Sequence, residues 1–129
     1  MKNITMPFEV TLWDAQNYDE TTFSPTLSEV TVKKFFDGDM KGESTGRLLM
    51  CTSRSDSAGY TIMDRFNVEI EGRKGSFVAI HGGMTDEMKA TGKIVPHSGT
   101  DELEDIKGTI EFKSDDVGKT IILDYTLDK

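Results

Sequence analysis

The chain has 129 residues, with 23 acidic and 15 basic side chains and a formal net charge of −8. This length predicts a single domain over residues 1–129, and the acidic balance argues against nucleic acid or a membrane surface as a partner. One cysteine excludes an intrachain disulfide, and two histidines are too few for the common zinc sites, so we expect neither a metal nor a cofactor.

The start of the chain gives no sign of export. Residues 1–8 mix polar and apolar side chains and lack the basic and apolar regions of a signal peptide. No apolar run approaches the roughly 18 residues of a membrane-spanning helix. With one free thiol and no export signal, we expect a cytoplasmic protein.

Alternation of apolar and polar residues, the period of a β-strand, dominates the first half of the chain. Residues 5–12 alternate cleanly, whereas residues 28–36 and 43–52 read as less regular strands rich in β-branched and apolar side chains. Residues 14–27, between the first two strands, are polar and contain one proline. We therefore expect a loop there.

The longest predicted strand follows at residues 60–70, where every even position except Asp64 is apolar. Residues 76–81, 84–95, 106–112 and 121–127 complete a set of eight strands. The turns on both sides of the longest strand are short. They predict that this strand pairs antiparallel with the third and the fifth strands.

Turns rich in glycine and charged residues separate the strands at residues 37–42, 71–75, 81–83 and 115–118. Residues 96–105 form a longer connection, in which Asp101 is placed to cap at most one short helical turn, with Glu104 reaching back. We therefore expect an all-β fold, an eight-stranded antiparallel up-and-down β-barrel. Closure into a barrel removes the strand edges that the alternative, a sandwich, leaves exposed.

Two motifs are specific enough to suggest a family, and three shorter segments support them. The motifs are Gly72-Arg73-Lys74-Gly75-Ser76-Phe77 and Val95-Pro96-His97-Ser98-Gly99-Thr100, and the supporting segments are Phe8-Glu9-Val10, residues 38–44 and Leu123-Asp124-Tyr125. With these residues the chain resembles the bacterial domain-of-unknown-function family 3224 over nearly its whole length. The resemblance implies an allene oxide cyclase-like barrel and no settled activity, and an eight-stranded up-and-down barrel of this kind is also lipocalin-like.

Asp64 is the most informative residue of the sequence. It stands between Ile62 and Phe66 on the apolar face of the longest strand, so strand parity predicts that it faces the interior. A buried carboxylate is costly unless it is paired or protonated. It is therefore either a ligand-binding acid or general base, or a structural carboxylate that accepts hydrogen bonds; we name it the one candidate catalytic residue.

Arg47 is a candidate partner for Asp64 or for an anionic ligand, if its face of the third strand is interior. If that face is exterior, Arg47 and Glu43 form a weak surface pair instead. The apolar neighbours Leu48 and Met50 have the opposite parity and favour the exterior position.

His81 shares a strand face with Phe77 and Ala79, and His97 lies in a loop. Both can titrate near neutral pH, but we interpret each as a hydrogen-bonded structural histidine. Cys51 has no neighbouring signature of a nucleophile, so we assign it to packing.

The candidate ligand-binding residues are Arg47 and the large or polar side chains predicted to face the interior. They are Tyr60, Ile62, Asp64, Phe66, Met84, Met88, Ile110, Phe112 and Tyr125.

An eight-stranded barrel is wide enough to hold one small ligand. We therefore expect a binding protein, rather than an enzyme, for a small apolar or weakly anionic molecule. One alternative is an isomerase or cyclase that acts on a lipid-like substrate, with Asp64 or a bound water as its base. Another is a filled barrel that acts by self-association, as a homo-oligomer, or through a protein partner.

Overall fold

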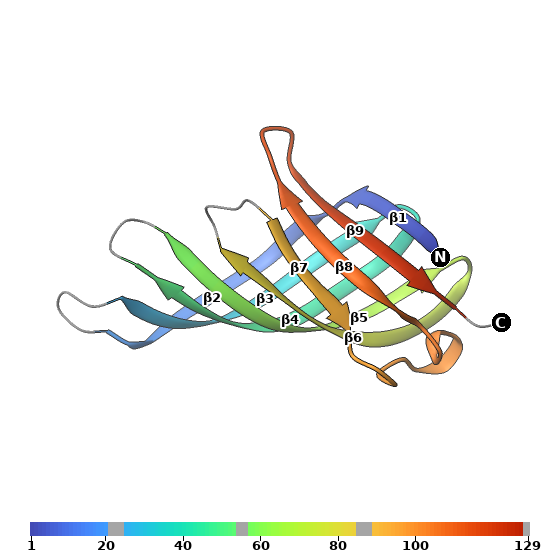
Figure 1. Ribbon diagram of the computed structural model, residues 1–129, viewed down its shortest axis with the longest axis horizontal. Helices are drawn as coiled ribbons and strands as arrows, with labels where there is room; N and C mark the ends of the chain where they lie inside the picture. Colours follow the sequence, from blue (N-terminus) through green and yellow to red (C-terminus); the bar gives the residue numbers. More distant parts are fainter. Residues whose placement is uncertain (21–24, 54–56, 85–88, 128–129) are drawn as a thin grey trace.

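The computed structural model describes residues 1–20, 25–53, 57–84 and 89–127. Within these residues nine antiparallel strands form one sheet, and a single 3-10 turn lies outside it (Figure 1). The elements are β1 (Lys2–Pro7), β2 (Glu9–Asp19), β3 (Thr26–Asp37), β4 (Met40–Thr52), β5 (Ala58–Ile70), β6 (Arg73–Met84), β7 (Lys89–Ile94), η2 (Asp101–Leu103), β8 (Lys107–Ser114) and β9 (Lys119–Thr126).

The order of strands in the sheet is β1-β9-β8-β7-β6-β5-β4-β3-β2. Strands that follow one another along the chain are therefore neighbours, except β1, which pairs with β9 at the far edge. The pairing predicted for the longest strand is confirmed. β5 pairs antiparallel with both β4 and β6, and places Asp64 opposite Gly46 on one side and Ala79 on the other.

The prediction of a closed eight-stranded barrel is wrong, because the nine strands form a curled half-barrel (Figure 1). The extra strand comes from residues 5–12, which split at Phe8 into β1 and β2. β1 pairs with β9, and β2 pairs with β3. The Phe8 ring packs between Phe36 and Phe112, with ring centroids 5.9 and 5.3 Å away, so the chain changes partner there.

Other predicted boundaries also move. β2 continues to Asp19, so much of the expected loop at residues 14–27 is strand. The expected turn at residues 81–83 lies inside β6. A Cβ atom at Gly82 would lie 2.2 Å from the backbone oxygen of Tyr60 on β5, so this glycine permits close strand approach rather than a turn. The strand expected at residues 84–95 is reduced to β7 in the described part of the chain.

The helical turn expected within residues 96–105 is present as η2, but the predicted cap is wrong. Thr100 occupies the position before the turn, and no side chain caps it. Asp101 is the first residue of the turn itself, with a φ of 53°. The Thr100 hydroxyl instead lies 2.7 Å from Ser76 Oγ and accepts a hydrogen bond from the Ser76 backbone.

The two motifs singled out in the sequence contact each other. Ser76, in the first motif, bonds to Thr100 in the second. Ser98 accepts a hydrogen bond from the Val78 amide and donates one to the Val78 carbonyl. These contacts hold residues 96–100 against β6, so the two motifs have a structural role.

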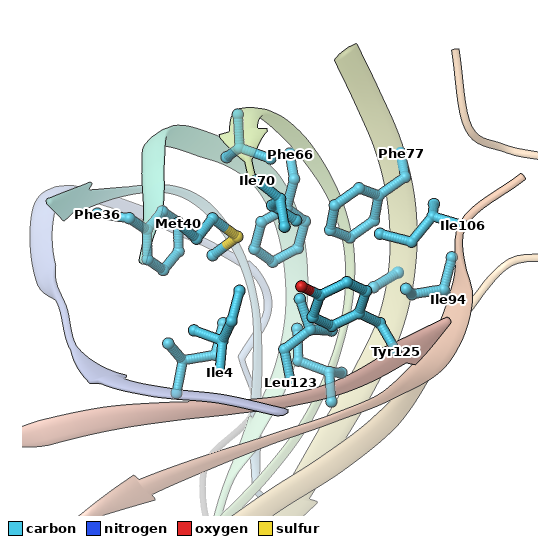
Figure 2. Packing of buried hydrophobic residues seen from close by; sticks show 14 of the residues in the cluster. Ile4, Phe36, Met40, Phe66, Ile70, Phe77, Ile94, Ile106, Leu123 and Tyr125 are labelled. Carbon is cyan, nitrogen blue, oxygen red and sulfur yellow. The ribbon is translucent and has the colours of Figure 1, made fainter. Parts of the chain in front are cut away.

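A large apolar core, which we call the filled core, occupies one end of the half-barrel (Figure 2). Phe36, Phe66 and Phe77 stack in a row, with successive ring centroids 5.6 and 4.8 Å apart. Each such fully buried side chain contributes roughly 1.5–3 kcal/mol compared with an exposed one. The even-numbered, inward positions of β3 and β5 supply Phe36 and Phe66, as strand parity requires.

The turn between β5 and β6 fastens this end of the molecule. Glu71, in that turn, accepts a 2.6 Å hydrogen bond from the Tyr125 hydroxyl on β9 and pairs with Lys2 on β1. Strands from opposite parts of the sheet are thereby joined across the filled core. Among the described residues, no helix has the length and apolar character to cross a membrane.

Candidate functional site

Four polar side chains lie on the inner face of four successive strands, and we call them the polar layer. They are Lys34 on β3, Ser44 on β4, Asp64 on β5 and His81 on β6, exposed by 6, 0, 0 and 3%. Strand parity turns each of them inward beside apolar neighbours. The polar layer separates the filled core from a smaller apolar cluster of Val30, Val32, Leu48 and Ile62.

One oxygen of Asp64 joins the layer together. Lys34 Nζ donates a hydrogen bond of 2.8 Å to Asp64 Oδ2, and His81 Nε2 lies 3.1 Å from the same oxygen. The Lys34 ammonium also lies 5.2 Å from the centre of the Phe112 ring. The buried carboxylate is therefore paired, with a lysine and a histidine rather than with the candidate partner Arg47.

The surroundings of Asp64 and His81 shift the pKa values of both groups in directions that determine their protonation. Burial alone would raise the pKa of Asp64, but the hydrogen bonds from His81 and Lys34 and the Lys34 charge hold that pKa below its usual range. Burial lowers the pKa of His81, and the nearby Lys34 charge lowers it further, against the opposing effect of Asp64. At neutral pH the site therefore contains an ionised Asp64 and a neutral His81.

This protonation state also fixes the tautomer of His81. An ionised carboxylate can only accept hydrogen bonds, so the Asp64 contact requires the proton of the neutral imidazole on Nε2. Nδ1 then has a free lone pair. In the described part of the chain, Nδ1 of His81, Oδ1 of Asp64 and Oγ of Ser44 are buried without a hydrogen-bond partner, which is uncommon for buried polar atoms.

A pocket of about 390 Å³, which we call the hollow, opens beside the polar layer, next to the smaller apolar cluster. It exists because β3, β4 and β5 have 12 or 13 residues while β7 and β8 have 6 and 8, so the long strands extend past the short ones (Figure 1). Its lining is Phe8, Val10, Trp13, Val32, Lys34, Leu48, Tyr60, Ile62, His81, Met84, Lys89, Ala90, Phe112, Lys113, Ser114 and Lys119.

The structure places the predicted ligand-binding residues in three groups. Tyr60, Ile62, Met84 and Phe112 line the hollow, and Asp64 lies behind its wall, bonded to Lys34 and His81. Phe112 also belongs to the filled core, as do three residues that do not line the hollow, Phe66, Ile110 and Tyr125. Met88 lies outside the described residues.

Arg47 does not line the hollow, because Leu48 and its even-numbered neighbours occupy the inner face of β4. The exterior position, one of the two alternatives, is the one observed. Arg47 is exposed and pairs with Glu29 at 3.1 Å, rather than with Glu43 or Asp64. This pair belongs to the class of exposed salt bridges that contribute roughly 0–1 kcal/mol.

Sequence reasoning missed Lys34 and underestimated His81. The signal for Lys34 was present, since Val30, Val32 and Phe36 share its parity and face inward. His81 was placed on the correct face, with Phe77 and Ala79, but not beside Asp64. Their proximity depends on the register between β5 and β6, which puts His81 opposite Ile62, one inward position along β5 from Asp64.

The described residues contain no group of three or more His, Cys, Asp or Glu side chains that could hold a metal ion. The polar layer itself is poorly suited to a cation, because its one carboxylate is already paired with the Lys34 ammonium. What the layer can do is accept a proton or hydrogen bond at His81 Nδ1 and donate one from Lys34, which has two further N–H groups.

Comparisons with known proteins agree with the fold. The model of a family described as a protein of unknown function (DUF3224) matches residues 4–128. The structure is similar to the crystal structure of a protein with unknown function from this family in Shewanella oneidensis MR-1, with a TM-score of 0.88 and 28% sequence identity. The similarity covers 100% of this chain and 98% of that one. No curated protein matches the chain. Because the family match spans nearly all of the sequence, the chain belongs to the DUF3224 family.

Proposed function

We propose that the protein binds a small, largely apolar molecule in the hollow. The observation that supports this proposal is a pocket of about 390 Å³ whose lining is mainly apolar and aromatic, with Lys34 and His81 set into its wall. Ligand pockets in proteins typically measure roughly 300–1,000 Å³ and combine apolar walls with a few polar groups.

Exposed apolar side chains at the mouth of the hollow support the same proposal. Trp13 and Met84 are 52 and 56% exposed, and Val10 is exposed beside them. A bound apolar molecule would remove part of this surface from water, which is favourable. Three exposed lysines also line the hollow, so a weakly anionic ligand group would be tolerated at the mouth; they are Lys89, Lys113 and Lys119.

The single tryptophan of the chain lies in the lining and provides the test. Titration with 1-octanol, which does not absorb where tryptophan emits, is expected to shift the emission of Trp13 to shorter wavelength in a saturable way. Leu48→Phe, which narrows the hollow, should weaken this binding at least tenfold. The matched control is Leu49→Phe on the outer face of the same strand, which should leave it unchanged.

Two results would refute binding in the hollow. One is a fluorescence change that does not saturate, which would indicate unspecific partitioning of the alcohol. The other is equal weakening by Leu48→Phe and Leu49→Phe, which would mean that the inner face of β4 has no special role.

The pairing of Asp64 with His81 favours an acid–base enzyme as a second candidate. Asp64 orients Nε2–H and leaves Nδ1 free, which is the arrangement of a histidine general base. His81 replaces Asp64, the residue named from the sequence, as the candidate base, because Oδ2 of Asp64 is already bonded to both Lys34 and His81. Nδ1 would take a proton from the carbon beside a carbonyl, the electron pair would move to the oxygen near Lys34, and the proton would then return.

The enzyme candidate has its own test. In D₂O, 1-phenylpropan-2-one should exchange the hydrogens beside its carbonyl faster with the protein than with buffer, as followed by proton NMR. His81→Phe should remove this acceleration, while His97→Asn, at an exposed loop histidine, should retain it. Exchange at the buffer rate with the unaltered protein would reject the enzyme and leave the binding proposal intact.

A further inference from the structure

The two edge strands of the sheet, β1 and β2, differ in how well they are protected from pairing with another chain. β1 has six residues, begins with Lys2 and ends with Pro7, and a short strand, a lysine and a proline are common means of protecting an edge. β2 has 11 residues, contains neither lysine nor proline, and is exposed along its whole length. Among the described residues β2 pairs with β3 alone, so its second side presents backbone N–H and C=O groups for pairing.

The part of this edge that can accept a further strand is a regular run at residues 12–17, which we call the free edge. Register shifts between Val10 and Leu12 and between Asn17 and Asp19 interrupt the pairing of β2 with β3 at both ends of the run. Such irregularities bend a strand and limit pairing at an edge. Between them the register is even, so alternate residues direct both of their backbone groups outward. The free edge can therefore form backbone hydrogen bonds with an extended segment of similar length.

The two faces of the free edge differ in character. Trp13 lies opposite the buried Val32 and lines the hollow, so it faces the interior of the half-barrel. Ala15 has the same parity, whereas Asp14 has the opposite parity and faces outward. A strand added beside β2 would place its own alternate side chains on the same two faces. Those beside Trp13 would meet apolar surface, and those beside Asp14 would meet a carboxylate.

The charge of this segment separates the possible partners. Residues 9–20 contain no basic side chain and four acidic ones, which are Glu9, Asp14, Asp19 and Glu20. The outward side chains of β3 beside the free edge, Lys33 and Glu29, carry opposite charges and leave this balance unchanged. A second copy of β2 would bring acidic segments together, and like charges across a strand pair are unfavourable. A basic segment would place opposite charges across the pair instead.

We propose that the free edge binds an extended segment of another protein in which apolar and basic residues alternate. The segment adds a strand beside β2, with its apolar side chains next to Trp13 and its basic side chains near Asp14. Backbone hydrogen bonds supply the affinity of such strand addition, and the alternate side chains supply its specificity. The interaction requires no small molecule in the hollow.

Fluorescence anisotropy of the full chain with a labelled peptide of alternating lysine and valine tests the proposal. The chain is expected to bind this peptide and not the matched peptide of alternating glutamate and valine. Asp14→Lys should weaken binding by about three- to tenfold, because an attraction becomes a repulsion. The control is Glu43→Lys, which makes the same change in net charge at an exposed position of β4 and should weaken binding much less.

Methylation of the peptide backbone distinguishes strand addition from attraction between charges alone. Alternate amides of an added strand face β2, so methylation of one alternate set should abolish binding and methylation of the other should preserve it. Deuterium exchange at the outward amides of residues 12–17 should slow when the unmethylated peptide is added.

Three results would overturn the proposal. The first is no binding of the lysine–valine peptide, or equal binding of the glutamate–valine peptide. The second is the same effect from both methylated sets, which would mean that no strand is added. The third is a dimer in ultracentrifugation whose residues 12–17 are already protected from exchange without peptide, because a second copy would then occupy the free edge.

Discussion

Asp64 and Lys34 form an ion pair inside the protein, 2.8 Å apart, with side chains that are 0 and 7% exposed. Bringing two charges into the interior is costly, and their attraction offsets this cost only when the geometry is good. Such a pair is weak evidence of a gain in stability, but removal of one partner is strongly unfavourable. The pair is better explained by what it holds, since Asp64 also fixes the orientation and tautomer of His81.

Asp64→Asn is expected to lower the free energy of unfolding by about 3–5 kcal/mol, because the Lys34 ammonium is left buried without its counter-charge. Urea denaturation at pH 7 measures the loss. Glu43→Gln, an exposed carboxylate on β4, is the control and should change the free energy little. A loss below about 1 kcal/mol for Asp64→Asn, within the range of exposed pairs, would mean that Lys34 can move to solvent.

Stability should also fall as the pH is lowered through the range of histidine. The folded pKa of His81 is depressed, so the unfolded chain binds the proton more readily. The contribution of His81 is therefore complete above its unfolded pKa of about 6.5 and is lost as the pH falls toward the lower folded value. Asp64 acts in the same direction at more acid pH. Its contribution to the free energy of unfolding is present above an unfolded pKa of about 3.9 and is lost as the pH falls through the depressed folded pKa.

Urea denaturation at pH 7.5 and pH 5.5 measures the histidine step. His81→Phe should reduce the difference in unfolding free energy between the two pH values, and His97→Asn should keep the difference seen in the unaltered protein. If His97→Asn instead removed it, the exposed loop histidine would be responsible and the assignment to His81 would be wrong.

The residue pattern was sufficient to predict that Asp64 is buried, but not to predict its partners. Because side chains alternate between the two faces of a strand, the position in the sequence determines which face a side chain occupies. It does not tell which distant side chains share that face at the same height. Lys34 and Asp64 are on strands separated by β4, so their contact depends on two registers and on the reach of a lysine.

At the scale of elements, β4 makes this contact physically feasible. Ser44 lies opposite Lys34, and Gly46 lies opposite Asp64, so the inward side chains of β4 are small between the charged groups. Neighbouring strands are roughly 4.8 Å apart, so the Lys34 side chain must cross about twice that distance, over β4. Larger side chains on β4 would occupy the path.

Gly46→Ala is expected to destabilise the protein by about 1–3 kcal/mol through overpacking. A Cβ atom at this position would lie 2.7 Å from Cδ1 of Ile62 and 2.8 Å from Oδ1 of Asp64. Thermal or urea denaturation measures the effect, with Thr45→Ala on the exposed face of β4 as the control. A stabilising effect would show that the Asp64 carboxylate can shift without losing Lys34.

Element boundaries were predicted less well than element types, for physical reasons that differ between sites. The split at Phe8 leaves the alternation of apolar residues in phase, so no pattern in the sequence marks it. In β6 the misleading signal was a pair of glycines, Gly82 and Gly83, that allow close approach to neighbouring strands rather than reversing the chain. Local patterns cannot distinguish these uses of glycine, because the difference lies in a neighbouring strand.

At the scale of the whole molecule, one sheet encloses two different interiors. Side chains from every strand except β2 fill one of these interiors, the filled core (Figure 2). Beyond the polar layer, the long strands continue without full cover, and the hollow lies there. Sequence patterns predicted a β-rich antiparallel fold and the inward side chains, but the unequal strand lengths that create the hollow depend on ends that the sequence placed poorly.

Tyr125→Phe tests how the turn between β5 and β6 is held against β1 and β9. The change removes the hydroxyl that bonds to Glu71 and keeps the ring in the filled core. Amides at the turn between β5 and β6 should exchange with deuterium faster in this variant, because one of the two contacts of Glu71 with β1 and β9 is lost. Tyr18→Phe, at an exposed position of β2, is the control. Unchanged exchange at the turn would show that Lys2 alone suffices.

The pairing of β1 with β9 has a consequence for how the chain reaches its final form during synthesis. Lys2 pairs with Tyr125, so the first strand has no partner edge until the last one has been made. The hairpins from β3 to β6 need only neighbouring segments and can form early, while β1 waits as an exposed strand. We expect the contact of Lys2, in β1, with Glu71 to form once β1 has joined β9. Any chain released before residue 119 lacks the whole of β9, and with it the strand to which its N-terminal segment belongs.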